Sequence, residues 1–269
     1  MNDVVCGMAL VAWSFACSPG LEAETYEWIG GTGDWSDSSR WNPSTGVPGV
    51  GDTASVSSGT VVVSVDTSVG ELELSGARIS GAGVLTVVTS LDWGGGTMGQ
   101  GGTTVIGAEA VGTLSGDAVR LLDGRILRVL GTLNHAGSGL LRFSYASAVE
   151  IESGGVLDFQ VDAVWNHYQG TQSSLRNAGT IRKSGGTGES RIETPRPVNE
   201  AGGLIEAASG TLVLPVGVSG GGSFHSVAGA TLSVPGSAEL SDATFTAVSY
   251  THLTLPTTDV VCSARWSRA

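Results

Sequence analysis

The run Trp165-Asn166-His167-Tyr168 is the densest group of side chains that could recognise a small molecule. Aromatic rings can stack on the face of a sugar ring, while the amide and imidazole groups beside them can exchange hydrogen bonds with its hydroxyls. Trp165, His167 and Tyr168 are therefore the candidate glycan contacts. The alternative interpretation is that these side chains pack within or beside a loop of the fold.

Paired carboxylates are the second group to consider, because glycosidases and polysaccharide lyases use acidic side chains at the bond that they cleave. Asp158 and Asp162 are four residues apart, and Asp34 and Asp37 are three residues apart. Neither pair belongs to a recognised catalytic motif, and the other acids are spread along the chain. We therefore expect no catalytic residues and a protein that is not an enzyme.

Histidines and glycine-rich stretches give no signal for a metal or a cofactor. His135, His167 and His225 have no partners at metal-ligand spacing. The glycine-rich stretches 94–102 and 217–222 do not join a strand to a helix, so we interpret them as turns rather than phosphate-binding loops. The calcium-binding nonapeptide pattern is also missing, which leaves an isolated calcium ion at a turn as the one metal alternative.

The composition argues against nucleic-acid binding and in favour of short strands. The formal net charge is −12, and an acidic chain does not follow a phosphate backbone. Glycine is abundant, with 42 residues, whereas charged residues make up only 14% of the chain. Glycine and β-branched residues disfavour long helices and suit strands separated by tight turns. We therefore expect an all-β fold.

A repeat of 24 residues organises the chain. Each copy starts at a glycine, and six of the seven copies have an apolar residue two positions later. The glycines are Gly59, Gly83, Gly107, Gly131, Gly155, Gly179 and Gly203, and the later positions are Val61, Leu85, Glu109, Leu133, Leu157, Ile181 and Ile205. A further copy, at Gly229, arrives two residues late.

A repeat of this size is typical of one coil of a solenoid. Apolar residues alternate with others in segments such as Val61 to Val65, which is the period of a strand. We predict a single-stranded parallel β-helix (β-solenoid) with about 24 residues per coil, whose roughly seven to nine coils make a rod on the order of 35–45 Å long. Each repeat glycine is expected to open a turn, where a positive φ is often required.

Two sets of charged residues alternate in sign at the same 24-residue spacing. Opposite charges that lie over one another in a parallel stack attract, and a register slip would place the wrong groups together. We therefore expect two outward-facing ladders that help to fix the register. The first ladder consists of Arg128, Glu152, Arg176 and Glu200, and the second consists of Asp158, Arg182 and Glu206.

Residues 24–58 are rich in tryptophan and precede the regular solenoid, which we place at residues 59–247. A stack of coils exposes an unpaired strand at each end, and such an edge promotes aggregation unless it is covered. We expect Trp28, Trp35 and Trp41 to form a cap over the N-terminal end. A sugar-binding platform is the alternative for these tryptophans.

The motif Trp28-x-Gly-Gly-x-Gly-x-Trp35, followed by Pro48-Gly-x-Gly-Asp52, resembles the opening of bacterial secreted β-strand-repeat proteins. Those proteins are similar in style to autotransporter passengers and filamentous adhesins. The resemblance extends from Trp28 to about Phe245 through segments such as Asp123-Gly-Arg125. It implies a parallel β-solenoid in a large exported surface protein that often carries further domains downstream, and it brings no catalytic residues with it.

Both ends of the chain are expected to lie outside the fold. Residues 1–23 hold a short apolar run followed by small residues, which is typical of a secretory signal peptide. Residues 248–269 can be spelled as the translation of a sequencing adapter, so we interpret them as an artefact that truncates the solenoid. All three cysteines, Cys6, Cys17 and Cys262, lie in these two ends, so the body between them has no disulfide.

We therefore expect a secreted or cell-surface bacterial repeat protein with a structural or adhesive role. Surface glycans, or a host or neighbouring cell surface, are its expected partners, and a missing C-terminal domain would supply an anchor. The chain as given is expected neither to span a membrane nor to bind nucleic acid. The alternative function is a carbohydrate-binding spacer of a larger polysaccharide-processing enzyme, which coplanar, exposed rings of Trp165 and Tyr168 would favour.

Overall fold

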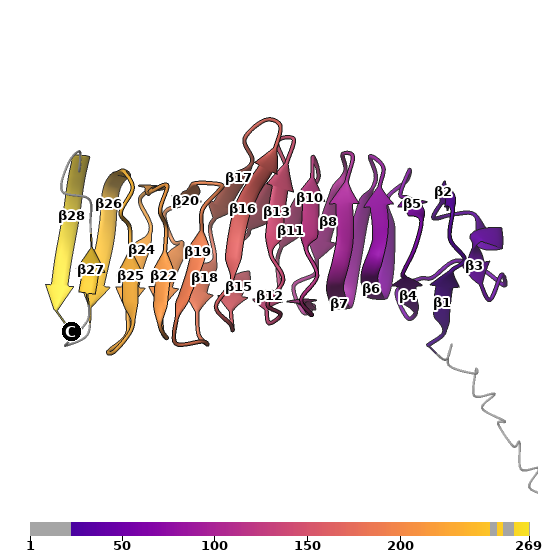
Figure 1. Ribbon diagram of the computed structural model, residues 1–269, viewed down its shortest axis with the longest axis horizontal. Coiled ribbons are helices and arrows are strands. Elements are labelled where there is room, and N and C mark those ends of the chain that lie inside the picture. Colours follow the sequence, from indigo (N-terminus) through magenta and orange to yellow (C-terminus); the bar gives the residue numbers. More distant parts are fainter. Residues whose placement is uncertain (1–22, 248–251, 255–260, 269) are drawn as a thin grey trace, which may run out of the picture.

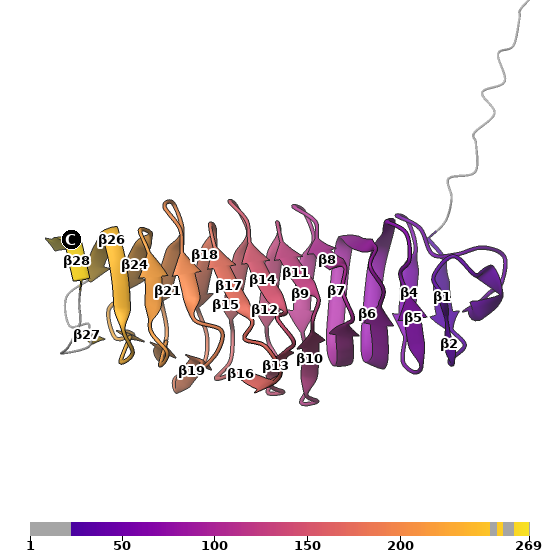
Figure 2. The same ribbon diagram turned by 90° about the horizontal axis from the view of Figure 1, so that it is seen from above.

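The computed structural model describes residues 23–247, 252–254 and 261–268. The chain winds into an all-β parallel solenoid of about nine turns, as the sequence predicted (Figure 1). The turns follow one another along a single axis in both views (Figures 1 and 2). Within the described residues, no helix is long and apolar enough to cross a membrane.

Three parallel sheets form the faces of the solenoid, and each regular coil gives one strand to each face. The first face contains β8 (Thr103–Ile106), β11 (Ile126–Val129), β14 (Ala148–Ile151), β17 (Ser174–Asn177), β20 (Pro197–Asn199) and β23 (Val218–Gly220). The second face contains β9 (Val111–Leu114), β12 (Thr132–His135), β15 (Val156–Phe159), β18 (Thr180–Lys183), β21 (Leu204–Ala207) and β24 (Ser223–Ser226). The third face contains β10 (Arg120–Asp123), β13 (Leu141–Ser144), β16 (Val164–Gln169), β19 (Glu189–Ile192), β22 (Thr211–Val213) and β25 (Thr231–Ser233).

The strands at the two ends of the solenoid are less regular. The N-terminal coils contain β1 (Thr25–Trp28), β2 (Thr32–Asp34), the 3-10 helix η1 (Ser38–Arg40), β3 (Trp41–Asn42), β4 (Thr53–Val56) and β5 (Thr60–Val62). The long strands β6 (Thr67–Ser80) and β7 (Val84–Gly99) bend around all three faces. The far end contains β26 (Ala238–Ala247), β27 (His252–Thr254) and β28 (Val261–Arg268).

The coil length varies along the solenoid and averages about 21 residues, which corrects the constant, longer coil that the sequence predicted. The first coil is long, since Thr25 pairs with Thr53, and the next coil is much shorter, since Thr53 pairs with Glu71. The 24-residue spacing holds on the second face, where Val156 pairs with Thr180 and Thr180 pairs with Leu204. The next step, from Leu204 to Ser223, is shorter again. The turns absorb these differences, so the strands stay in register although the sequence spacing changes.

The core is a set of inward-facing columns, because alternate side chains of each strand point to the same side of a sheet. One column on the second face consists of Leu133, Leu157, Ile181, Ile205, Phe224 and Phe245, all of which are buried. Its last two rings are stacked with their centroids 5.0 Å apart. The apolar residue expected two positions after each repeat glycine therefore belongs to this column from Leu133 to Ile205.

The repeat glycines of the central coils are required by close stacking and not by an unusual φ. A β-carbon on Gly131, Gly155, Gly179 or Gly203 would collide with backbone carbonyl oxygens of the preceding coil. None of these four residues has a positive φ, which contradicts the expectation from the sequence. In two of these coils the positive φ belongs to the residue before, at Gly154 (88°) and Gly202 (92°).

The other glycines of the 24-residue series do not belong to the same column. The backbone N–H of Arg78 donates to Gly59, and the N–H of Thr103 donates to Gly83, so the coils stack there with a shorter period. At the far end, Gly222 and Ser223 lie over Gly203, whereas the segment after Gly229 lies over Gly210. The 24-residue repeat of the sequence therefore places one repeat glycine over another only in the central coils.

Substitution of Gly179 by alanine is expected to lower the free energy of unfolding by about 2–3 kcal/mol, because the new methyl group forces two backbone segments apart. Urea denaturation monitored by circular dichroism measures this change. The control is Gly51→Ala, because a β-carbon on Gly51 meets no atom within 4 Å. Equal stabilities of the two variants would show that the coils are not stacked this closely.

Candidate functional site

Trp165 is not a glycan contact, because its side chain is completely buried. It lies on the inner side of β16, in register between Leu141 and Ile192 of the neighbouring coils. Its indole N–H donates to Nδ1 of His135 over 2.8 Å. The tryptophan fills the core at this coil, and a platform formed by coplanar, exposed rings of Trp165 and Tyr168 is ruled out.

Tyr168 is exposed because β16 contains a β-bulge. Phe143 pairs with His167, but Ser144 pairs with Gln169, so Tyr168 is the extra residue that the neighbouring strand does not match. Tyr168 is 53% exposed, and the guanidinium carbon of Arg142 lies 5.3 Å from the centre of its ring. His167, the third candidate contact, is half-buried. Bulges commonly redirect side chains at functional sites.

Tyr145 is a second exposed aromatic residue, and the sequence analysis missed it. It is 54% exposed and has a φ of 50°, while Ala146 has a φ of 57°. Its ring lies against Gly170 of the next coil, where a β-carbon would collide with the ring. The backbone N–H of Tyr145 donates to Gln169 of that coil over 3.2 Å. Only the stacking of the two coils places Tyr145 near Tyr168, so no local motif reveals it.

Arg142 differs from the other cations of the protein. Among residues 23–247, it is the one arginine or lysine that has neither a carboxylate nor a backbone carbonyl as a partner. Arg142, Tyr145 and Tyr168 are hereafter called the tyrosine pad. The loop between β16 and β17, which follows Tyr168, extends further from the rod than its neighbours in Figure 1.

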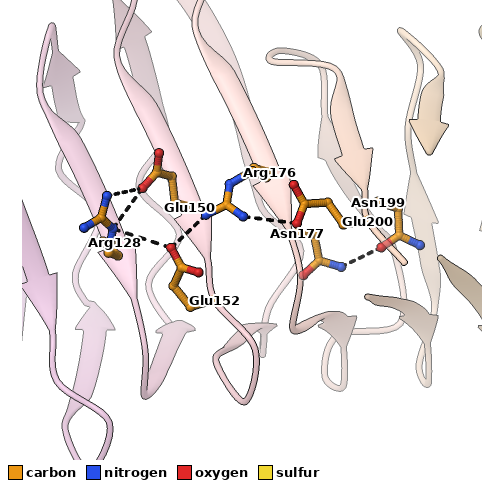
Figure 3. Close-up of polar contacts among 7 residues, drawn as sticks. All are labelled: Arg128, Glu150, Glu152, Arg176, Asn177, Asn199 and Glu200. Atoms are coloured by element: carbon orange, nitrogen blue, oxygen red, sulfur yellow. Dashed lines mark hydrogen bonds and ion pairs between the residues drawn. The ribbon is translucent and has the colours of Figure 1, made fainter. Parts of the chain in front are cut away.

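The first charge ladder runs along the first face (Figure 3). Glu152 lies 3.5 Å from Arg128 and 2.7 Å from Arg176, and Arg176 lies 3.1 Å from Glu200. Glu150 joins the ladder through a contact of 2.8 Å with Arg128. In the strand register it is Glu150 that pairs with both Arg128 and Arg176, while Glu152 reaches them from the turn that follows β14.

The second ladder lies on the second face, where Asp158, Arg182 and Glu206 pair in register. Arg182 binds Asp158 at 2.8 Å, and this hydrogen bond raises the pKa of Arg182. Glu206 lies 2.7 Å from His225 on the next coil. Asp158 was expected to face outward, but it is only 1% exposed. The ion pair with Arg182 is therefore partly desolvated.

Arg176 is the centre of the first ladder, and its substitution by glutamine is expected to lower the free energy of unfolding by about 0.5–1 kcal/mol. The effect is small because the side chains of this ladder are partly exposed and water screens their charges. The measurement is urea denaturation at low and high salt, since salt should reduce the difference between wild type and variant. A loss that does not change with salt would argue against an electrostatic ladder.

The paired carboxylates are engaged in structural contacts. Asp162 lies 2.7 Å from Nζ of Lys183 and accepts the backbone N–H of Gly188, and the hydrogen bond from Lys183 lowers the pKa of Asp162. Asp34 accepts hydrogen bonds from Ser36, which lower its pKa, and Asp37 accepts from Ser39. In the described part of the chain, no three His, Cys, Asp or Glu side chains converge in an arrangement that could hold a metal ion.

The three tryptophans of residues 24–58 lie together at the N-terminal end of the rod. Trp41 makes edge-to-face contacts with Trp28 and Trp35, with ring centroids 5.1 and 5.0 Å apart. Its indole N–H donates to the carbonyl oxygen of Trp35 over 2.9 Å. All three are buried, so their faces are covered by the protein itself. This packing leaves no open ring in the cluster for a sugar.

The core also holds charged and polar side chains whose burial the sequence analysis did not predict. They include Arg120, Arg125, His135, Asn177, Lys183 and Asn199. Asn177 donates to Oδ1 of Asn199 over 2.8 Å, so the two side chains form a short ladder inside the first face (Figure 3). A signal for Lys183 did exist, because it lies four residues after Gly179, as the buried Phe159 lies after Gly155.

Comparisons with protein-family models, curated proteins and solved structures find no match to this chain. The fold itself defines its class, an all-β protein built as a parallel β-solenoid repeat. The predicted signal peptide lies outside the described residues. In the segment interpreted as adapter sequence, the structure describes only the strands β27 and β28.

Proposed function

We propose that this chain is an extracellular structural or adhesive rod of a bacterial surface or matrix and that it is not catalytic. One observation carries the proposal: the charged side chains of the two ladders pair from coil to coil along the rod. Arg176 bridges Glu152 and Glu200, and Arg182 binds Asp158. A catalytic site needs charged groups that converge on one bond, whereas ladders stiffen a long, regular surface.

Export to the cell surface is part of the proposal. The resemblance to autotransporter-like passengers and the apolar N-terminal run both support a secreted protein. Residues 24–247 contain no cysteine, so this segment does not depend on disulfide formation. The continuous core and the close stacking of the coils supply the stability that such a protein needs outside the cell.

The second candidate function is a carbohydrate-binding spacer of a larger polysaccharide-processing enzyme. The exposed ring of Tyr168, held against Arg142, favours it. In both functions the solenoid binds through its outer surface. In the first it is part of a surface or matrix rod, and in the second it is attached to an enzyme. A fold alone does not separate them.

Adhesion in flow tests the proposal. Beads coated with the full chain are passed over bacterial cell-envelope material and over immobilised polysaccharides, and the same polysaccharides are assayed for cleavage. We expect retention of the beads without any cleavage product. Beads coated with the urea-unfolded chain are the control. Release of cleavage products, or retention no better than that of the unfolded control, would overturn the proposed function.

A further inference from the structure

The tyrosine pad offers two open aromatic surfaces at one corner of the rod. Tyr145 and Tyr168 are each more than half exposed, although the neighbouring Phe143 and Trp165 are completely buried. Large aromatic side chains normally gain free energy by burial, and tyrosine is enriched at contact surfaces because its ring has an apolar face and a polar edge.

Both rings are held in place before any ligand arrives. Tyr168 leaves the strand at a β-bulge and is covered on one side by the guanidinium group of Arg142. Tyr145 has a left-handed backbone conformation and lies against Gly170, where the chain has no side chain. Left-handed conformations are unfavourable for residues other than glycine, and they persist where the surroundings fix them. A ligand would therefore lose little free energy in ordering the pad.

The pad also carries an uncommitted positive charge on an acidic protein. Within residues 23–247, every other arginine and the single lysine contacts a carboxylate or a backbone carbonyl, whereas Arg142 has neither partner and stacks on the ring of Tyr168. Arg191, two coils further along the same face, is flanked by Glu189 and Glu193. Arg142 thus keeps its donors available for a carboxylate from outside the chain.

These features suit a saccharide better than a protein partner. Tyrosine gives a rigid surface with an apolar face and a polar edge, which matches the C–H face and hydroxyls of a sugar ring. A stable protein interface buries roughly 800 Å² on each partner, which is far more than two rings and one guanidinium group provide. Charge complementarity with Arg142 selects a sugar that carries a carboxylate.

We propose that the tyrosine pad binds an acidic saccharide, with a sugar ring stacked on Tyr168 or Tyr145 and its carboxylate held by Arg142. The inference rests on the proposed adhesive function and names the class of ligand that the rod would recognise.

Isothermal titration calorimetry with a galacturonate tetrasaccharide and a neutral galactose tetrasaccharide tests this proposal on the full chain. We expect the acidic probe to bind more tightly and its affinity to fall as salt is raised. Arg142→Gln should weaken binding of the acidic probe about 10-fold and leave the neutral probe within about 2-fold. Tyr168→Ala should weaken binding of both probes about 5- to 10-fold, whereas Tyr168→Phe should keep most of the affinity.

Arg191→Gln is the matched control, because it removes an outward arginine of the same face whose carboxylate partners are already present. The proposal would be overturned if Arg142→Gln bound the acidic probe with wild-type affinity. It would also be overturned if the wild-type chain bound neither probe. If such a chain is still retained on cell-envelope material in the flow assay, only the saccharide site fails and the adhesive function stands. If that retention is then lost in Tyr168→Ala, the pad serves a protein partner instead.

Discussion

Substitution of Arg125 by methionine is expected to lower the free energy of unfolding by about 3–5 kcal/mol. Arg125 is buried between coils and donates to the carbonyl oxygens of Gly81, Gly101 and Thr103, at 2.9, 2.7 and 3.0 Å. Burial lowers the pKa of Arg125 to about 10, so the side chain is charged at neutral pH and carbonyl dipoles compensate its charge. Methionine fills a similar volume, but it leaves these buried oxygens without their donor.

The comparison for this prediction is Arg191→Met, which removes an arginine of the same kind from the outer surface. That variant should lose less than about 1 kcal/mol, because its ion pairs are exposed. Both are measured by urea denaturation of the full chain. If Arg125→Met were as stable as Arg191→Met, the buried arginine would not hold the coils together.

Acid is expected to destabilise the protein through His135, by about 2.5 kcal/mol between pH 7.5 and pH 4.5. His135 is fully buried. Its Nδ1 accepts the indole N–H of Trp165, so the ring proton is on Nε2. Nε2 donates to the carbonyl oxygen of Gly139, 3.0 Å away. The contact with Trp165 requires the neutral ring, because a protonated Nδ1 cannot accept a hydrogen bond. Burial, together with the positive charge of Arg120, lowers the pKa of His135 to about 4.

The sign of the effect follows from the two pKa values. In the unfolded chain, His135 binds a proton as the pH falls through its ordinary value of about 6.5, but in the folded protein it does so only near pH 4. Protons therefore favour the unfolded chain between these values, and stability is lost as the pH falls. Above pH 6.5 the ring is neutral in both states and the effect disappears.

The variant His135→Leu isolates this contribution from that of the carboxylates. It should be less stable than wild type at pH 7.5, because the indole N–H of Trp165 loses its acceptor. It should also lose about 2.5 kcal/mol less than wild type between pH 7.5 and pH 4.5. An unchanged dependence in His135→Leu would contradict the account of the buried neutral histidine.

The sequence predicted the fold class because a repeat is a global signal. Leu133, Leu157, Ile181 and Ile205 share a spacing, and only a stack of coils explains a shared spacing over so many residues. The same spacing was enough to predict that Arg176 lies beside Glu152 and Glu200. The apolar column lies on the second face of the central coils, where the 24-residue spacing holds. On the first face the strand register differs, and Glu152 reaches Arg176 from the turn that follows β14.

The sequence could not give the remaining features, because they depend on how individual turns are built. Turns that differ in length bring Thr53 over Glu71 and Leu204 over Ser223, and no single period describes both. Trp165 appeared to belong to a polar aromatic run, yet its place in β16 points it into the core. Tyr145 becomes part of a site only because the next coil presents Gly170 to its ring.

The central claim is that the chain is one continuous stack of coils, and a distance between spin labels tests it most directly. Thr53 and Thr244 lie on the same outer column of the second face, joined by strand pairing through Glu71, Ser90 and Val111 and onward along the stack. Labels at these two positions, in a chain whose native cysteines are changed to serine, are measured by pulsed electron paramagnetic resonance.

The nine strand-to-strand steps between Thr53 and Thr244 predict a backbone separation of about 43 Å at about 4.8 Å per step. A second pair, at Thr132 and Leu204, is three steps apart and should give about 14 Å. Narrow distributions at these two distances would support the continuous solenoid. A broad distribution would contradict it, and so would a distance between Thr53 and Thr244 below about 25 Å, which is too short for that number of strand spacings.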